Sequence, residues 1–341
     1  MSSVNYNDNG FGKRSLTDEQ QSKINEVRAS LGVLPEKLYL YCTDASITRY
    51  LVARNWNVKK ATKMLKETLK WRLHYKPEEI LWDEVAHEAE TGKIYRSIYH
   101  DKYGRSILVM RPGRQNTKST KGQIRYLVYC MENAILNLPP EQEQMVWLID
   151  FQGFNMSHIS VKVTKETADI LQNHYPERLG LAILYDPPKL FEPFWKVVRP
   201  FLDPKTFKKV KFVYPSVSDS KKIMEDTFNM DELDCAFGGK NQFIFNVDDY
   251  ATRMREEDKR MLLFWSQGNA SSCEQPSLTT PDATFSKPDS ASDSDESEKE
   301  SHGRSEVLDR KISPEDCVVD LSSTQNGNGS SHGNTNSGKD Q

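Results

Sequence analysis

The chain lacks the features that mark secreted, zinc-binding and membrane-spanning proteins. Its cysteines are scattered and never form a Cys-x-x-Cys pair, which argues against a disulfide framework and a zinc site: Cys42, Cys130, Cys235, Cys273 and Cys317. Residues 1–14 contain no apolar core of a signal peptide. No apolar run approaches the ~18 residues that span a bilayer. We therefore expect a cytoplasmic protein with no bound metal, and any membrane contact should be transient and peripheral.

Signatures of common enzyme classes are also missing. The sequence has no G-x-S-x-G elbow, no Walker A loop, no G-x-G-x-x-G after a strand and no H-E-x-x-H helix. Cys42 stands too far before Arg49 for the thiolate cradle of a cysteine-dependent phosphatase. Asp150, at the end of a predicted strand, is explained more simply as a cap of the following loop than as a catalytic carboxylate. We expect that the protein is not an enzyme.

Bulky apolar residues are scarce in residues 268–341, where Ser, Asn, Gly, Asp and Glu dominate. Such a segment cannot bury enough apolar surface to offset the entropy of ordering, so it is predicted to be a disordered acidic tail. It holds 14 acidic and 6 basic residues, net -8, while residues 1–267 hold 35 and 40, net +5; together they give the -3 of the whole chain. A mildly basic globule can attract an anionic membrane surface. We expect that partner, and no nucleic acid.

The pattern of apolar residues changes near residue 90. Helical signals fill residues 15–90, with capping residues at Thr17, Thr43 and Asn57. Beyond them, strand-like runs alternate with helical stretches; the strands are Lys93–Tyr99, Ser106–Met110, Met145–Phe151, Leu179–Leu184, Val210–Val213 and Gln242–Phe245. Alternation of this kind predicts an α/β fold with a largely parallel sheet flanked by helices. We divide the chain into a flexible N-terminus (1–14), a helical N-terminal subdomain (15–90), an α/β domain (91–267) and the tail.

The stretch Leu190–Leu202 is unusually aromatic and lies beside an ionic cluster in the sequence, Glu177, Arg178, Lys208 and Lys209. As one helix it would carry two adjacent apolar stripes, Leu190, Phe194, Val197 and Phe201, and Phe191, Trp195, Val198 and Leu202. Such a helix belongs in a core, over an apolar cavity or at a membrane. A helix buried in a core would not require the neighbouring ionic cluster, so the charge argues against that interpretation. An apolar wall beside fixed charges suits an amphiphile with an anionic head, so we favour a lipid.

Several separate motifs resemble those of the CRAL-TRIO lipid-binding family. Ile47–Arg72 is similar to the family's helical N-terminal signature, and five motifs follow in the family's order: DKYGR (Asp101–Arg105), IDFQGF (Ile149–Phe154), YPERLG (Tyr175–Gly180), PFLDPKTFKK (Pro200–Lys209) and FGGK (Phe237–Lys240). The resemblance covers about residues 15–265 and points toward the phosphatidylinositol/phosphatidylcholine transfer proteins. It implies a fold that encloses an apolar lipid pocket, with bound phospholipid and no other cofactor. It also implies a gate helix at Pro193–Asp203, which carries Phe194, Trp195, Val198 and Phe201.

The resemblance further implies a head-group site for phosphatidylinositol. Six positions match the family's polar set in residue type: Arg54, Asp101, Glu177, Arg178, Thr206 and Lys209. Their chemistry suits the ligand, because Lys, Arg and a hydroxyl donate to phosphate while carboxylates accept from inositol hydroxyls. An alternative stays open, in which Glu177, Arg178 and Lys209 only form salt bridges with one another.

The choline half of the family's pattern is absent here. Where the relatives have Ser and Thr two residues apart on a strand, this chain has Met145 and Trp147, and a strand places both on the same face. A tyrosine of the family's pattern is replaced by Leu108. We expect a pocket wall of Leu108, Met145 and Trp147 to exclude phosphatidylcholine, although Trp147 retains a ring that can stack on a cation.

The sequence therefore predicts a monomer that binds phosphatidylinositol and transfers it between membranes, in support of phosphoinositide signalling or lipid traffic. Two other interpretations stay open. One is a lipid sensor or scaffold that presents lipid to a phosphoinositide kinase without net transfer. The other is a carrier of a different hydrophobic ligand, such as a sterol or an isoprenoid.

Overall fold

Five strands form one sheet in the order β1-β2-β3-β4-β5 in the computed structural model, which describes residues 16–266. The strands are β1 (Ile94–His100), β2 (Ser106–Met110), β3 (Met145–Asp150), β4 (Leu179–Tyr185) and β5 (Val210–Val213). β1 runs antiparallel to β2, and the other three neighbouring pairs are parallel. The predicted α/β fold with a largely parallel sheet is confirmed. Because β2 to β5 run in the same direction, their first residues share one border of the sheet, called the amino edge below.

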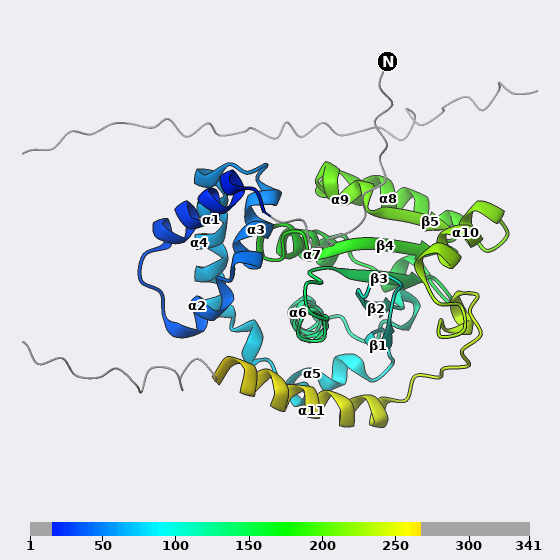
Figure 1. The fold of residues 1–341 in the computed structure, drawn as a ribbon. Helices are drawn as coiled ribbons and strands as arrows, with labels where there is room; N and C mark the ends of the chain where they lie inside the picture. The colour runs from blue at the N-terminus through cyan, green and yellow to red at the C-terminus, as the bar shows by residue number, and fades with distance from the viewer. Residues whose placement is uncertain (1–15, 267–341) are drawn as a thin grey trace, which may run out of the picture. The chain divides into compact units, whose positions relative to one another are not determined.

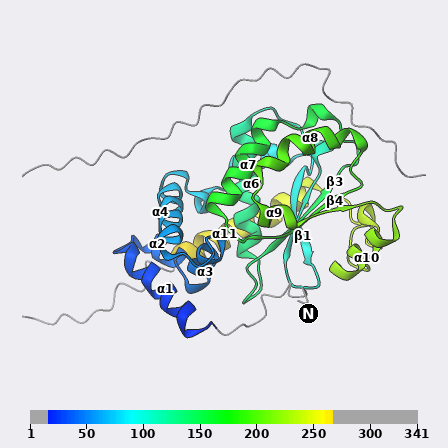
Figure 2. The same cartoon turned by 90° about the horizontal axis from the view of Figure 1, so that it is seen from above.

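The first part of the chain is helical, as the sequence predicts. It contains α1 (Asp18–Leu31), α2 (Glu36–Tyr41), α3 (Asp44–Ala53), α4 (Val58–Tyr75) and α5 (Trp82–Ala89). The side chains of Thr17, Thr43 and Asn57 each accept a hydrogen bond from the backbone N–H three residues on, so the expected caps begin α1, α3 and α4. Helices α1 to α4 share a small apolar core of their own and group beside α7 (Figure 2).

Helices surround the sheet (Figure 1). They are α6 (Thr120–Leu136), α7 (Val161–His174), α8 (Glu192–Val198), α9 (Pro204–Lys208), α10 (Ser218–Thr227) and α11 (Val247–Ser266). Figure 1 shows α6 and α7 on one side of the sheet, α8 and α9 beyond β5, and α5 with α11 at the opposite end, near β1. None of the helices between residues 16 and 266 is long and apolar enough to cross a membrane.

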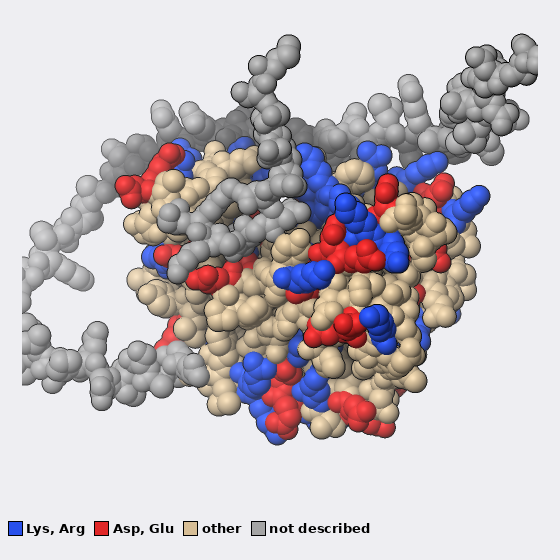
Figure 3. Space-filling view, turned by 45° about the vertical axis from the view of Figure 1, so that its right-hand side comes forward, with Lys and Arg blue, Asp and Glu red and all other residues tan. Residues whose placement is uncertain are grey.

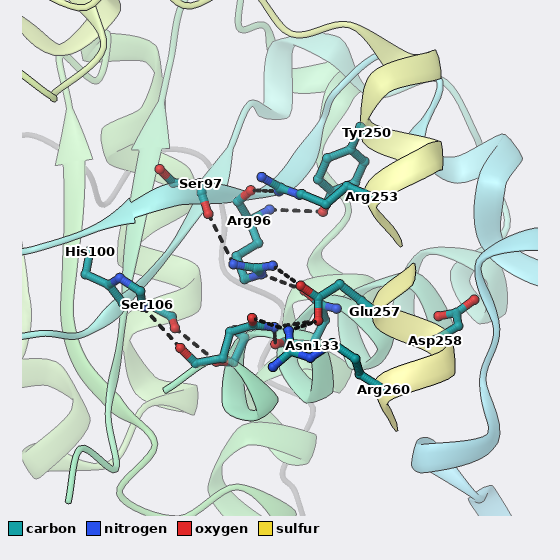
Figure 4. A network of polar contacts seen from close by, with 12 residues as sticks. Arg96, Ser97, His100, Ser106, Asn133, Tyr250, Arg253, Glu257, Asp258 and Arg260 are labelled. Carbon is teal, nitrogen blue, oxygen red and sulfur yellow. Dashed lines mark hydrogen bonds and ion pairs between the residues drawn. The ribbon is translucent and has the colours of Figure 1, made fainter. Parts of the chain in front are cut away.

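A buried polar network holds α11 against β1 and α6 (Figure 4). The guanidinium of Arg96 donates to Asn133 Oδ1 at 2.6 Å and to Glu257 Oε1 at 2.9 Å, and its backbone N–H donates to the Tyr250 hydroxyl at 3.0 Å. The carboxylate, amide and hydroxyl partners are buried with Arg96, and the buried charge of Arg96 is compensated by Glu257. The helix α11, which precedes the predicted tail, is therefore fixed beside β1.

Two sequence predictions of local structure are wrong. Gln242–Phe245 is not a strand, and Asn241 makes only an isolated bridge to Asp234. Phe243 and Phe245 pack beside Tyr95, so the alternating apolar pattern reflects packing on the outside of the sheet rather than pairing within it. The predictions for residues 1–14 and 268–341 lie outside the described residues.

Leu190–Leu202 is likewise not one helix. It consists of a 3₁₀ turn (Lys189–Phe191), α8, and a second 3₁₀ turn (Arg199–Phe201). Pro200 accounts for the second break, because its ring and its missing N–H are incompatible with a helix interior. The buried stripe consequently combines members of both predicted stripes, Phe191, Phe194 and Val198, whereas Leu190 and Val197 are about half exposed.

Candidate lipid-binding cavity

An apolar cavity of about 290 Å³ lies between the sheet and the helices α6, α7 and α8. The strands β3 and β4 contribute Trp147, Ile149, Leu179, Ala182 and Leu184; the helices contribute Leu127, Leu171, Phe194, Trp195 and Val198. Polar side chains in the lining come from residues next to strands, such as Lys93 and Arg111, and from the helices, such as Gln123, Thr164 and Thr206. The cavity thus offers a hydrocarbon chain a mainly apolar wall that includes single polar groups.

The three predicted wall residues differ in their relation to this cavity. In the register of the sheet, Leu108 lies directly beside Trp147, and Met145 lies two residues before Trp147 on the same face. Only Trp147 contributes to the cavity lining, while Leu108 and Met145 are fully buried. Leu108 and Met145 therefore flank Trp147 on the same face of the sheet without reaching the cavity.

The helix α8 covers the cavity with the apolar face that the sequence predicts. Phe194 and Val198 point inward, and Trp195 is partly buried beside Phe207 and Phe212. Phe191 meets Phe151 at a centroid distance of 4.6 Å, which anchors the start of α8 to the loop after β3. Phe201, the fourth predicted gate residue, is partly exposed and lies under the ammonium group of Lys165.

Three of the six predicted head-group residues stand at the amino edge. Glu177 and Arg178 precede β4, and Lys209 precedes β5. The Lys209 ammonium meets Glu177 Oε2 at 2.9 Å, with the two side chains 21% and 13% exposed. Glu177 has a φ of 59°, a left-handed conformation that a non-glycine residue keeps only where its surroundings hold it. This ion pair is accessible enough to exchange partners.

Arg178 is held by a different carboxylate. It donates to the Glu143 side chain at 2.8 Å and to the Glu143 backbone carbonyl at 2.9 Å. Arg49 of α3 binds the same carboxylate, so two guanidinium groups share one acid. Burial, together with the nearby charge of Arg49, lowers the pKa of Arg178 to about 10. One excess positive charge is therefore built into this part of the amino edge.

Thr206 lies in α9 and lines the cavity. Its hydroxyl donates to Asp203 Oδ2 at 2.5 Å, and Asp203 also accepts the N–H groups of Lys205 and Thr206 as the cap of α9. The ammonium of Lys205 reaches the end of α3, where it donates to the Val52 carbonyl at 2.9 Å and to Asn55 Oδ1 at 2.8 Å. Arg54, another predicted head-group residue, lies between these two acceptors in the sequence.

Asp101 serves the turn between β1 and β2. It is buried, and its carboxylate accepts the N–H groups of Tyr103 and Arg105 and the side-chain Nε of Arg105 at 2.6 Å. The guanidinium of Arg105 extends over the start of β4, where a Cβ on Gly180 would approach it to 2.9 Å. Asp101 thus reaches the amino edge through Arg105 rather than by its own carboxylate.

The sequence motifs did not predict the contacts of Arg49, Glu143 and Lys205. A signal for Arg49 was available, because the run Arg49–Arg54 within the N-terminal signature begins and ends with an arginine. Glu143 lies in a polar loop 94 residues from Arg49, and no local pattern marks it as the shared partner of two arginines.

A second ionic network joins the helical part to the sheet near the same edge. Arg72 of α4 donates to Glu132 at 2.8 and 3.2 Å and to Glu78 at 3.0 Å, and the Tyr175 hydroxyl donates to Glu132 at 2.7 Å. Burial pushes the pKa of Glu132 upward, but the charge and hydrogen bonds of Arg72 outweigh it and leave the pKa lowered. Arg72 and Glu132 are almost completely buried.

His174 lies beside this network of Arg72, Glu78, Glu132 and Tyr175, called the joint network below because it joins α4 to the α/β part of the chain. Its ring stacks on Trp71 at a centroid distance of 4.3 Å, and its Nδ1 lies 3.3 Å from the Thr68 hydroxyl. Burial, reinforced by the charge of Arg72, lowers the pKa of His174 to about 4, so the imidazole is neutral near pH 7. No group of three His, Cys, Asp or Glu side chains within residues 16–266 is arranged to hold a metal ion.

Family models match this architecture. The model of the CRAL/TRIO domain matches residues 89–239, which contain the sheet and the cavity, and the model of the CRAL/TRIO N-terminal domain matches residues 19–67. The chain belongs to the CRAL-TRIO family.

Among curated relatives, the chain is 37% identical over 259 residues to a CRAL-TRIO domain-containing protein of Schizosaccharomyces pombe (71% of this chain, 25% of the relative). It is 32% identical over 231 residues to phosphatidylinositol transfer protein PDR17 of Saccharomyces cerevisiae (63% of each chain). A further CRAL-TRIO domain-containing protein of S. cerevisiae is 31% identical over 252 residues (66% of this chain, 79% of the relative). The first three curated relatives are covered over only 25%, 63% and 48% of their length.

Among solved structures, the chain resembles Sfh5 with a TM-score of 0.56. The alignment covers 74% of this chain and 98% of that chain at 16% sequence identity. This likeness supports the fold. The curated relatives include proteins named as phosphatidylinositol transfer proteins.

Proposed function

We propose that the protein binds phosphatidylinositol in the cavity and transfers it between membranes. The observation that carries the proposal is an apolar cavity with Thr206 in its wall, at the edge of the sheet where the accessible Glu177–Lys209 ion pair lies. Acyl chains would occupy the apolar space, and the inositol phosphate would lie at the amino edge. The relatives named as phosphatidylinositol transfer proteins support the same ligand.

The polar groups of the amino edge suit an inositol phosphate. Lys209 would donate to a phosphate oxygen, and the Thr206 hydroxyl offers a second donor. Glu177 would then accept from an inositol hydroxyl instead of from Lys209. The paired arginines Arg49 and Arg178, which share one acid, add positive charge behind the site, and Arg54 extends it from the end of α3. Asp101 acts through Arg105, whose guanidinium it orients.

Transfer requires that α8 move. The cavity in its closed form lies near the lower end of the ~300–1,000 Å³ common for small-molecule pockets, so a lipid with two acyl chains needs further space. Displacing α8 removes Phe194, Trp195 and Val198 from the wall and offers them to a membrane interface. Two basic residues of the same segment, Lys196 and Arg199, add attraction of about 1 kcal/mol each at an anionic surface.

On the face that Figure 3 presents, charge alone would hold the protein weakly at a membrane. Figure 3 shows Lys and Arg side chains interspersed with Asp and Glu on the face it presents, without a large field of one sign. Insertion of apolar side chains must therefore contribute to docking, and contact with the membrane is expected to be transient.

The test begins with the lipid that co-purifies with the protein, identified by mass spectrometry. Vesicle assays then measure transfer of labelled phosphatidylinositol and phosphatidylcholine. Lys209→Ala should reduce phosphatidylinositol loading by roughly 10- to 100-fold, because it removes a hydrogen bond to a charged group. Lys208→Ala is the matched control, since the neighbouring side chain is exposed on α9. Loading of phosphatidylinositol by Lys209→Ala at the wild-type level would contradict the proposal. Loading without transfer would favour the sensor or scaffold.

A further inference from the structure

The indole N–H of Trp147 has no hydrogen-bond partner, although the side chain is only 8% exposed. A buried donor without an acceptor costs free energy, and native proteins rarely tolerate one without a reason. Within the described residues, the indole N–H of Trp82 also lacks a partner, but Trp82 lies in α5 and does not contribute to the cavity. Arg111 Nε, another buried donor without a hydrogen bond, lies in the cavity lining but faces Asp150 Oδ2 at 3.3 Å in an ion pair. Of these three donors, the one in the cavity wall that faces no acceptor is Trp147.

The residues beside Trp147 in the sheet provide no side-chain acceptor. Its neighbours in the register of the sheet are Leu108 and Ala182, and the nearest lining contributed by the same strand is Ile149. The facing helices add Leu127 and Leu171, which are hydrocarbon, and the polar side chains of Gln123, Thr164 and Thr167, none of which accepts a hydrogen bond from the indole N–H. The small side chain of Ala182 leaves room for the indole ring on the cavity side. An oxygen of a ligand in the cavity can therefore supply the acceptor that these side chains do not.

The position of Trp147 sets the part of the ligand that it would meet. It is the third of six residues in β3, so it lies in the middle of the sheet and not at the amino edge, where the inositol phosphate is placed. The atom in question must thus be a single oxygen on an otherwise apolar part of the ligand. Two kinds of lipid carry one: a glycerolipid has ester carbonyls below its head group, and a sterol has a hydroxyl.

We propose that Trp147 is a specificity-determining residue that donates its N–H to one oxygen of the bound lipid. The inference rests on the proposed lipid-binding function of the cavity. Protein atoms cover the nitrogen, so the ring would have to turn as the lipid enters for the N–H to reach the lipid oxygen. A lipid with an oxygen at this depth is then preferred over the same lipid without it. From the usual net value of one neutral hydrogen bond, the preference is roughly 3- to 10-fold.

The first arm of the test uses phosphatidylinositol. Vesicles offer equal amounts of diester phosphatidylinositol and its diether analogue, which lacks both carbonyl oxygens, and the loaded lipid is quantified by mass spectrometry. The wild-type protein should prefer the diester. Trp147→Phe keeps an aromatic ring but removes the donor, so its ratio should approach one. Trp82→Phe makes the same chemical change outside the cavity and should keep the wild-type ratio.

The second arm offers a 3-hydroxysterol together with its 3-deoxy analogue, with the same three proteins. Preference for the hydroxysterol that disappears in Trp147→Phe would identify a hydroxyl as the oxygen that is read. If this occurs while phosphatidylinositol is not loaded at all, the inference stands and the proposed phosphatidylinositol carrier falls.

Four results would overturn the inference. If the wild-type protein loads both members of each pair equally, the Trp147 N–H does not contribute to lipid preference. This comparison uses only the wild-type protein, so it does not depend on whether the variant folds. A preference that survives in Trp147→Phe assigns the discrimination to another residue. Failure to load any of the four lipids removes both the inference and the proposed function. Equal loading of diester and diether phosphatidylinositol with no sterol loading would leave the carrier intact and reject the role of Trp147.

Discussion

Two ionic groups near the amino edge differ sharply in what they can do, although only one residue separates them along the chain. Tyr175 belongs to the joint network of Arg72, Glu78 and Glu132, in which each charged group is buried and has its partners within the protein. Glu177 belongs to a single ion pair with Lys209 that remains partly exposed. A closed network has no capacity for a ligand, whereas an isolated, accessible pair can exchange one partner for another. Stability and binding are therefore expected to separate between these two groups.

Breaking the closed network should have the largest effect. Arg72→Met removes the cation and leaves Glu78 and Glu132 buried without compensation, which should lower the free energy of unfolding by about 3–5 kcal/mol. Arg125→Met, which breaks the more exposed ion pair with Glu84, should cost only about 0–1 kcal/mol. Denaturant unfolding measures both. Equal losses of unfolding free energy in the two variants would show that the buried network contributes no more to stability than an exposed ion pair.

A change in the accessible Glu177–Lys209 pair should affect lipid loading strongly and the free energy of unfolding little. Glu177→Lys places a second cation against Lys209 and removes an acceptor for the inositol ring. Phosphatidylinositol loading should fall at least as far as in Lys209→Ala, by roughly 10-fold or more, while the free energy of unfolding changes by about 1 kcal/mol or less. A folded variant that loads the wild-type amount of lipid would reject the assignment of Glu177.

The protonation of His174 offers a smaller and graded way to weaken the joint. Its folded pKa of about 4 lies below the usual 6.5, so the unfolded state binds a proton more readily. This contribution to stability is fully present above pH 6.5 and is lost as the pH falls toward 4. In His174→Gln, the part of the pH dependence that arises between these values should disappear. Unfolding measured at several pH values with the same slope in both proteins would contradict this.

The smallest effect is expected from a change remote from both groups. Removing residues 268–341 deletes a segment of net charge -8 and should leave unfolding and lipid loading unchanged. Affinity for anionic vesicles should stay equal or rise, because a source of repulsion is gone. Vesicle sedimentation checks this prediction. Loss of lipid loading would show that these residues belong to the folded unit.

The sequence was most informative where the cause of a structure is local. Thr17, Thr43 and Asn57 predicted helix starts because a cap acts within three residues, and strands such as Ser106–Met110 were found to the residue. The pattern of Gln242–Phe245 misled, since the same alternation arises when aromatic rings pack on Tyr95 without strand pairing. The order of motifs along the chain predicted the family and hence the cavity.

Contacts between distant segments could not be predicted in this way. The motifs suggested Arg178 as a head-group ligand but contained nothing about Glu143, which holds it together with Arg49. Charge complementarity permits many pairings among 46 basic and 49 acidic residues, and only the fold selects among them. The unsatisfied N–H of Trp147 is hidden for the same reason, because it depends on which side chains the fold places around the ring.

The bond from Lys205 to the end of α3 makes the movement of α8 asymmetric. It fixes α9, directly after the gate, to the Val52 carbonyl and to Asn55, while the start of α8 packs through apolar contacts such as that of Phe191 with Phe151. An opening motion that keeps this bond must pivot about residues 199–203. The start of α8, near Leu190, is then displaced farther than its end. The tether would also transmit the position of the gate to the N-terminal helices, which could then respond to whether the cavity is open or closed.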